Sequence, residues 1–425
     1  MAIRLPSDPR ESTYEDLIAA CLTGLGFFVE ANLHLRDETT EILELDVVAT
    51  PVINPLGDVL LLDAKSGKTG IADIFKMFGW RIFLGIPRAC IVRPTAPDAS
   101  KLRSLVKLGS ETSVHVATVN LKDFDLSCFP SKSIAMPDVL RDKVIANAWY
   151  GRIGKRLCIH DFTQFSKRPD LTSPVKAKDY RWAIEQSFFA RQPLERARAV
   201  YDAYQTAAGI TGVVIDELAG KSGVYSTKLW DQVRDTHEKK AVQFCLMMEH
   251  TARLRIVKNS LIHLIQQESA EGTKDEALRW LLDEWAMPAS CQRGMAILQK
   301  HEFRNHIPFL WQLFIEVFGG FYCFADSSDV QTLSECTGIP ADTIPECLDL
   351  YGEFFPNSSG WFMTAKGELR IMKNVPAVYH GTGAFLRESL FGTGEYAKKI
   401  PHMAWLVGKW QNALYGILEP ELKAS

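Results

Sequence analysis

Charged residues interrupt two short apolar stretches of the sequence. Asp46 lies within residues 42–49, and Asp63 and Lys65 lie within residues 59–67. Both stretches have the aliphatic composition of buried strands, and the twofold repeat of a strand puts Asp63 and Lys65 on the same face. Burying ionised carboxylates without compensation is costly, and a divalent cation is one means of compensating them. Oxygen ligands of this kind suit Mg²⁺.

The elements that position these residues follow from apolar spacing and from glycine. Thr13 can cap a helix that ends at Gly24. Alternation in the second strand places Asp46 on one face with Glu44 and Val48, and antiparallel pairing with the third strand brings it to Asp63. The apolar periods predict three strands, a second helix and two more strands, at residues 27–35, 40–49, 59–64, 71–84, 89–93 and 114–119.

With these residues in this order, the first part of the chain resembles the PD-(D/E)XK, or restriction-endonuclease-like, nucleases. Within that superfamily it is most similar to the Mrr-like and Holliday-junction-resolvase-like branch. The resemblance covers about residues 10–95 and is carried by Tyr14-Glu15, Gly26-Phe27, Glu44-Leu45-Asp46-Val47-Val48 and Asp63-Ala64-Lys65. The triplet opens with Asp where many members of this branch have Glu, and the helix after Lys65 lacks a glutamine that some members carry.

The resemblance implies an activity and a role for each matching residue. It implies that Glu15, Asp46, Asp63 and the Ala64 carbonyl hold Mg²⁺, with Mn²⁺ as a substitute, and that Lys65 orients or deprotonates the attacking water or stabilises the transition state. The implied reaction is the hydrolysis of phosphodiester bonds in DNA by an endonuclease.

Other interpretations of these and neighbouring residues compete with this one. The strand charges can form a buried ion-pair cluster, and Glu15, next to Asp16, can serve the positive end of its helix. The run Ser66-Gly67-Lys68-Thr69-Gly70 is similar to the end of a phosphate-binding loop, but Leu62 stands where that loop needs glycine. His301 and His306 are five residues apart, which does not suit a shared zinc ion on a helix.

A basic stretch follows the predicted strands. Residues 141–181 carry ten Lys and Arg against four Asp, together with aromatic residues that include Trp149 and Tyr150. Cations interleaved with aromatic rings suit nucleic acid, so we expect Arg152, Lys155 and Arg156 to bind it, with Lys68 and Thr69 near the active site. The alternative is a solvated connector whose aromatic side chains dock on a neighbouring domain.

The chain of 425 residues is long enough for two or three domains. We predict an α/β nuclease domain with a mixed sheet over residues 1–130, a basic connector over 131–182 and a larger, mainly helical domain over 183–425. Residues 329–375 fit a helix pair followed by a hairpin, which is typical of a winged-helix DNA-binding unit, although helix pairs are also ordinary building blocks.

Composition limits the compartment and the partners. The net charge of −3 means that nucleic-acid binding would need a local basic face. Nine cysteines without metal-binding or disulfide spacing, and a start that has no secretory signal, predict a cytoplasmic protein. Residues 307–325 are apolar, but Gln312 and Glu316 favour a buried helix over a membrane span.

We therefore expect a bacterial restriction or anti-phage defence effector in which the helical domain senses a trigger or binds DNA. The expected partners are DNA, a second copy of the chain and a regulatory protein. The alternatives are a structure-selective repair or recombination nuclease, an inactive nuclease fold that only binds nucleic acid, and a scaffold that acts through protein contacts.

Overall fold

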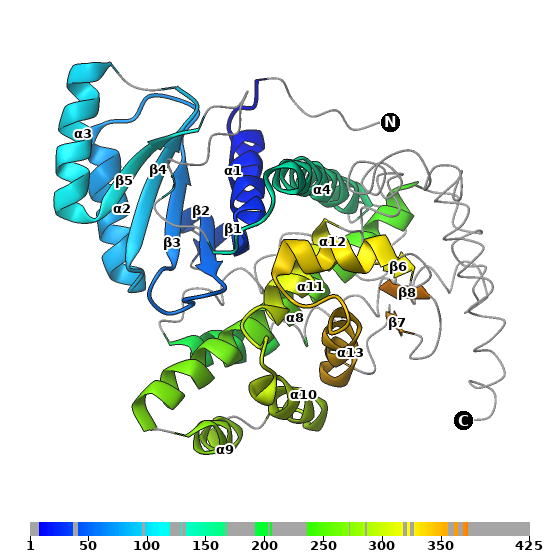
Figure 1. Cartoon of the computed structure of the whole chain (residues 1–425). Coiled ribbons are helices and arrows are strands. Elements are labelled where there is room, and N and C mark those ends of the chain that lie inside the picture. Colours follow the sequence, from blue (N-terminus) through cyan, green and yellow to red (C-terminus); the bar gives the residue numbers. More distant parts are fainter. Residues whose placement is uncertain are drawn as a thin grey trace, which may run out of the picture.

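The computed structural model describes residues 8–36, 41–95, 98–119, 129, 133–165, 167, 192–202, 205, 236–271, 273–284, 287–317, 321–323, 327–355, 361–363 and 369–372. A mixed five-stranded sheet with helices forms the N-terminal part, and a mainly helical region follows it, as predicted (Figure 1). The predicted domain boundaries near residues 130 and 182 lie outside the described residues. Within the described ranges, Cys21, Cys90, Cys291, Cys336 and Cys347 are buried thiols.

The N-terminal sheet has the strand order β1-β2-β3-β4-β5. Strand β2 (Glu41–Pro51) pairs antiparallel with both β1 (Phe27–Arg36) and β3 (Leu60–Ala64). Strands β4 (Arg88–Arg93) and β5 (Val114–Thr118) run parallel to β3. Every residue of β3 is buried, as expected for a central strand with helices on both faces.

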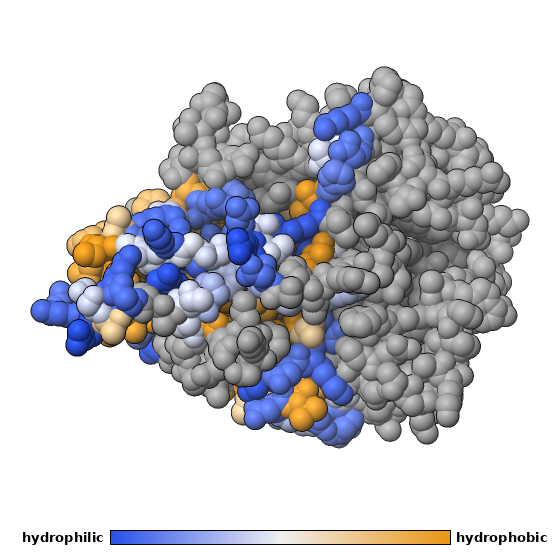
Figure 2. All heavy atoms as spheres, turned by 90° about the horizontal axis from the view of Figure 1, so that it is seen from above, coloured by the Kyte–Doolittle hydropathy of each residue, from blue (hydrophilic) through white to orange (hydrophobic). Residues whose placement is uncertain are grey.

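Helix α1 (Ser12–Gly24) covers one face of this sheet, and α2 (Ile71–Leu84) covers the other (Figure 1). The predicted helix over residues 71–84 is confirmed, but of Ile74, Phe75, Phe78 and Ile82, whose spacing puts them on one apolar side, only Ile74 is buried. The helix buries Ile74 and Met77 and exposes Phe75 and Ile82. Figure 2 shows apolar residues interspersed with polar ones on the surface of the end of the molecule formed by α2 and residues 99–112.

Helix α3 (Ala99–Thr112) was not predicted. Its buried residues are Leu105, Gly109 and Thr112, so few large apolar residues mark its buried face in the sequence. The usable signal was its cap, because the Asp98 side chain accepts a hydrogen bond from the Lys101 amide at 2.9 Å.

The first half of the predicted connector is a long helix, α4 (Asp138–Phe165), that packs against α1. The helices approach so closely that a Cβ added at Gly24 would lie 2.4 Å from Cγ1 of Ile145. The indole of Trp149 donates a hydrogen bond to the Thr13 carbonyl at 3.2 Å. Trp149 and Tyr150 are buried in the same core cluster as residues of α1, so they offer no stacking face to nucleic acid.

The helical region contacts the sheet at its edge strand, β1. Residues 193–202 are helical, and α8 (Thr236–Glu271), α9 (Lys274–Glu284), α10 (Ala289–Lys300) and α11 (Ile307–Glu316) follow. The side-chain amide of Gln312 donates to the Val29 carbonyl at 2.7 Å and accepts from the Val29 amide at 2.8 Å. Helix α11 is buried, as predicted, and in the described part of the chain no helix has the length and apolarity that crossing a membrane requires.

The predicted helix pair and hairpin near residues 329–375 are present. They are α12 (Ser327–Thr337), α13 (Ile344–Phe354), β7 (Trp361–Met363) and β8 (Leu369–Met372). Gly338 makes the turn after α12 with a φ of 70°, which glycine adopts without strain. A third strand, β6 (Phe321–Cys323), completes an antiparallel sheet of order β6-β8-β7.

Candidate active site

Asp63 and Lys65 meet at the carboxyl end of β3. Asp63 is 2% exposed. The Lys65 ammonium lies 3.4 Å from Oδ2 of Asp63 and 3.8 Å from Oδ1 of Asp73 at the start of α2. The Lys65 amide donates to the Val92 carbonyl at 2.8 Å, which continues the β3–β4 ladder past the end of the strand. The predicted proximity of these two residues is confirmed.

Asp46 reaches the same place from β2. Its Oδ2 accepts a hydrogen bond from the Ala64 amide at 2.6 Å. Burial raises the pKa of Asp46 to about 7, and the carboxylate of Asp63 adds to the rise, while the Ala64 amide opposes it. Among the described residues Asp46 has no ion pair with a cation, which distinguishes it from Asp63.

Glu15 faces this pair of acids from the first turn of α1. Burial raises the pKa of Glu15, Arg156 works against the rise, and the carboxylates of Glu44, Asp16 and Asp63 add to it. The neighbouring Asp16 points instead toward α4, where it accepts a hydrogen bond from Nε of Arg156 at 2.5 Å. Arg156 lies farther from Glu15, at 3.9 Å.

Lys76 of α2 also belongs to this site, although it was missed in the sequence. Its ammonium lies 3.7 Å from Oδ1 of Asp63 and 4.0 Å from the centre of the Trp80 ring. Asp63 therefore has two lysines nearby, yet both distances exceed that of a good charge-assisted hydrogen bond. Its buried Oδ2 has no hydrogen-bond partner within the described part of the chain.

In the β1–β2 hairpin, the alternation of side chains between the two faces of the sheet switches at Asn32. This residue lies opposite Asp46 in the register and has a φ of 53°. On the inner side of this point, Val29, Val47 and Ala49 join the core cluster that contains α1. Beyond it, Leu33, Leu43 and Leu45 join the cluster that contains residues of α2.

The change of face corrects one prediction from strand alternation. Val48 packs on the α2 side of the sheet, whereas Glu44 lines a cavity together with Glu15 of α1. Glu44 and Val48 therefore do not share a face with each other, as a regular strand would require. The left-handed backbone at Asn32 turns the outer half of the hairpin, and no residue spacing marks that position.

The cavity beside Glu15 has a volume of about 430 Å³. It is lined by acids of α1 and β2, polar residues of β1 and cations of α4, among them Glu15, Glu44, Asn32, His34, Arg152, Lys155 and Arg156. The three α4 cations predicted to bind nucleic acid thus lie together and beside the acids. Arg152 lies 3.6 Å from Glu316 of α11, and Arg156 binds Asp16, so two of the three also join helices to one another.

The two remaining predicted contact residues differ in exposure. Lys68 is exposed at the turn after β3. Thr69 is 1% exposed, so its hydroxyl does not reach a surface that nucleic acid could touch. The structure does not support the predicted contact of Thr69 with nucleic acid, because the side chain packs inward as α2 begins.

The oxygen atoms at this site suit a hard divalent cation. No three side chains of His, Cys, Asp or Glu within the described ranges are arranged to hold a metal ion. Asp46 and Asp63 supply two carboxylates close to the Ala64 peptide, and within the described ranges the buried Oδ2 of Asp63 has no well-formed hydrogen bond, with the Lys65 ammonium 3.4 Å away. These residues fit Mg²⁺ as two carboxylates completed by a carbonyl and water.

Comparison of the chain with models of protein families, with curated proteins and with solved structures found no match. The interpretation of the site therefore rests on the residues and on their geometry.

Proposed function

We propose that this protein is a metal-dependent endonuclease that hydrolyses phosphodiester bonds in DNA. The observation that carries the proposal is Asp46, a partly buried carboxylate that faces Asp63 and whose pKa is raised to about 7. A purely structural ion-pair cluster would give this carboxylate a cation. Mg²⁺ bound by Asp46 and Asp63 would supply the missing charge.

The residues of the site would take different roles in the reaction. Asp46, Asp63 and the Ala64 carbonyl would hold the metal ion, which would activate a water molecule and neutralise charge on the phosphate. Burial lowers the pKa of Lys65, but Asp63 and Asp73 raise it more, so the net direction is upward. Lys65 is therefore a cation at neutral pH, which favours orienting the water or stabilising the transition state over accepting a proton.

The ion-pair interpretation accounts for only part of the site. Lys65 and Lys76, at 3.4 and 3.7 Å, can balance Asp63 without a metal ion. They leave Asp46 unbalanced, and they do not explain why Glu15 faces the same acids. The non-cutting nucleic-acid binder remains the second candidate, since it would keep the same cavity and cations beside Glu15.

The helical region is proposed as the part that decides when the nuclease acts. Residues 327–355, which include α12 and α13, contain no Lys or Arg and six acids, namely Asp329, Glu335, Asp342, Glu346, Asp349 and Glu353. DNA phosphates would be repelled by such a surface. We therefore favour sensing or protein contact over DNA reading for this unit, as in a defence effector, and a dimer if both DNA strands are cut.

The first test is a cleavage assay on purified protein. Wild type, Lys65→Ala and Asp63→Ala are incubated with supercoiled plasmid, linear duplex, single-stranded DNA and RNA, in Mg²⁺, Mn²⁺ or EDTA. Wild type should cut DNA only with a metal ion, and each variant should lose at least about a hundredfold in rate, as expected when a transition-state group is removed.

The matched control is Asp58→Asn. Asp58 is an acid of the same domain that pairs with Arg88 at 2.8 Å, away from Asp46 and Asp63. It should cut as fast as wild type. Retained turnover in Lys65→Ala or Asp63→Ala would overturn the site, whereas metal-dependent binding without cutting would favour the binder.

A further inference from the structure

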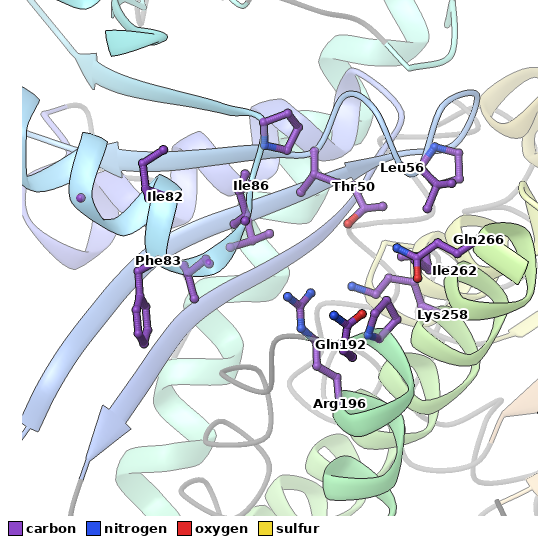
Figure 3. Close-up of a pocket in the computed structure, with 18 of the residues that line it drawn as sticks. Thr50, Leu56, Ile82, Phe83, Ile86, Gln192, Arg196, Lys258, Ile262 and Gln266 are labelled. Carbon is purple, nitrogen blue, oxygen red and sulfur yellow. The ribbon is translucent and has the colours of Figure 1, made fainter. Parts of the chain in front are cut away.

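A second cavity, of about 990 Å³, lies between the N-terminal sheet and the helical region (Figure 3). Its walls come from β2, from the end of α2 and the turn after it, from residues 192–196 and from α8. Cavities of this size are large enough for a cofactor or a nucleotide.

This cavity is distinct from the candidate active site. Lys65 and Asp63 contact the first half of α2, at Asp73 and Lys76. The cavity is lined by the last residues of the same helix, among them Ile82 and Phe83. Helix α2 has 14 residues, which corresponds to roughly 20 Å of length.

One wall of the cavity is polar and positively charged. In Figure 3 the Lys258 ammonium, the Arg196 guanidinium and the Thr50 hydroxyl point into the same space. Lys258 is buried, and it is held by Glu30 at 2.6 Å. No Asp or Glu lines the cavity among the described residues. An anion placed here would meet two cations and a hydroxyl donor.

Burial lowers the pKa of Arg196, while the carboxylates of Glu30 and Glu195 oppose the shift. Arginine nevertheless keeps its charge in proteins. The planar guanidinium, which has lost part of its water, can bind two oxygen atoms of a phosphate group through two parallel hydrogen bonds.

The opposite wall is apolar and partly aromatic. Ile82 and Phe83 are 59% and 46% exposed, and Ile86 lies next to them. Figure 3 places these side chains across the cavity from Arg196 and Lys258. A ligand that fills the space therefore has an anionic end and a flat or apolar body.

The amides of Gln192 and Gln266 add hydrogen-bonding groups to the polar side. Each side-chain amide can both donate and accept, as the edge of a nucleobase requires of its partner. Inorganic phosphate alone would leave the apolar wall and both amides unused.

We propose that this cavity binds a small organic phosphate of nucleotide size, with its phosphate against Arg196 and Lys258 and its base against Phe83. The site does not depend on the nuclease activity proposed above. A nucleotide here would contact both β2 and α8, and so would join the sheet to the helical region beside the ion pair between Glu30 of β1 and Lys258 of α8.

The test is isothermal titration of the full chain carrying Lys65→Ala, in EDTA, so that neither cutting nor the metal site contributes. The probes are the four ribonucleoside monophosphates, adenosine, inorganic phosphate and a single-stranded oligonucleotide. At least one monophosphate should bind about tenfold or more tightly than adenosine or inorganic phosphate, because charged hydrogen bonds contribute about this much.

Three further substitutions locate the binding. Arg196→Gln should weaken the monophosphate about tenfold or more and leave adenosine unchanged. Arg198→Gln makes the same change of charge two residues along the helix at a side chain that does not line the cavity, and it should bind as the parent does. Phe83→Ala should weaken both the monophosphate and adenosine.

Three results would overturn the proposal. They are the absence of binding for all four monophosphates, equal losses in Arg196→Gln and Arg198→Gln, and binding of the oligonucleotide alone. The last result would assign the cavity to a nucleic-acid strand. Thermal unfolding of each variant, matched to the parent, excludes loss of the fold as the cause.

Discussion

At the scale of single residues, the lysines of the candidate site balance only part of the negative charge of its carboxylates. Asp63 lies near Lys65 and Lys76, whereas Asp46 forms no ion pair among the described residues and accepts a hydrogen bond from the Ala64 amide. Stability alone does not select such an arrangement. A site that must accept a cation does require it, and this difference can be measured without any substrate.

We predict that Asp46→Asn stabilises the metal-free protein. The pKa of Asp46 is raised on folding, so its ionised form opposes folding at pH 8. The Asn side chain keeps an oxygen that can accept from the Ala64 amide, and it removes the charge. Urea unfolding in EDTA at pH 8 should give a gain of about 1–2 kcal/mol, less than the whole shift implies because the site relaxes.

Adding Mn²⁺ or Mg²⁺ separates a metal site from a strained acid pair. The metal ion should stabilise wild type through its binding to the folded state, and it should stabilise Asp46→Asn less. Asp58→Asn, which breaks the pair with Arg88, serves as the control and should gain nothing in EDTA. A destabilised Asp46→Asn protein in EDTA would contradict the charge argument.

At the scale of elements, the sequence predicted the features that depend on residues close together in the chain. The spacing of apolar residues predicted the order of α1, β1 to β3, α2, β4 and β5. Asp63 and Lys65 were identified as site candidates because they are charged residues in an otherwise apolar strand. Helix α3 was missed because its buried face is narrow. The change of face in the hairpin was missed because it depends on the backbone of Asn32, which has no apolar signature.

We predict that Asn32→Val destabilises the protein and that Asn32→Gly does not. A φ of 53° suits Asn and Gly, whereas a β-branched residue is strained there. The cost for Val should be about 1–3 kcal/mol in the free energy of unfolding, measured by urea titration. DNA cleavage should also fall in Asn32→Val, since Glu44 and Asp46 flank the turned segment of β2.

The Gly variant controls for loss of the Asn side chain. If the amide matters and the backbone does not, both variants will lose stability and activity to the same extent. Equal stability of Asn32→Val and wild type would instead show that the hairpin adopts its twist without the left-handed residue.

At the scale of the whole molecule, the helical region is joined to the sheet by polar contacts that the sequence did not reveal. Gln312 bonds to β1 across 283 residues of sequence, and Lys258 bonds to Glu30 across 228. Gln312 was noted only as evidence against a membrane span, and Glu30 passed as an ordinary strand residue. Partners so distant in sequence produce no local pattern, so the sequence predicted both regions but not the contacts between them.

The ion pairs of Glu30 allow the contribution of charge to the contact between the two regions to be measured. Glu30 is 3% exposed and lies 2.6 Å from Lys258 and 2.9 Å from Arg255, both on α8. Burial acts to raise the pKa of Glu30 from 4.5, but these two cations outweigh it and the net direction is downward. The carboxylate therefore stabilises the fold above the unfolded pKa, and this stabilisation is lost as the pH falls through the lower, folded value.

Glu30→Gln should accordingly cost about 3–5 kcal/mol in the free energy of unfolding at pH 7, because Lys258 and Arg255 lose their buried counter-charge. The gap between wild type and variant should narrow as the pH falls below 4.5, the reference pKa of a Glu side chain. Glu346→Gln, at an exposed position of α13, should stay within about 0.5 kcal/mol of wild type. Urea titrations at several pH values measure all three proteins. A gap that is small at pH 7, or that does not change with pH, would mean that Gln312 and apolar packing join the two regions without help from charge.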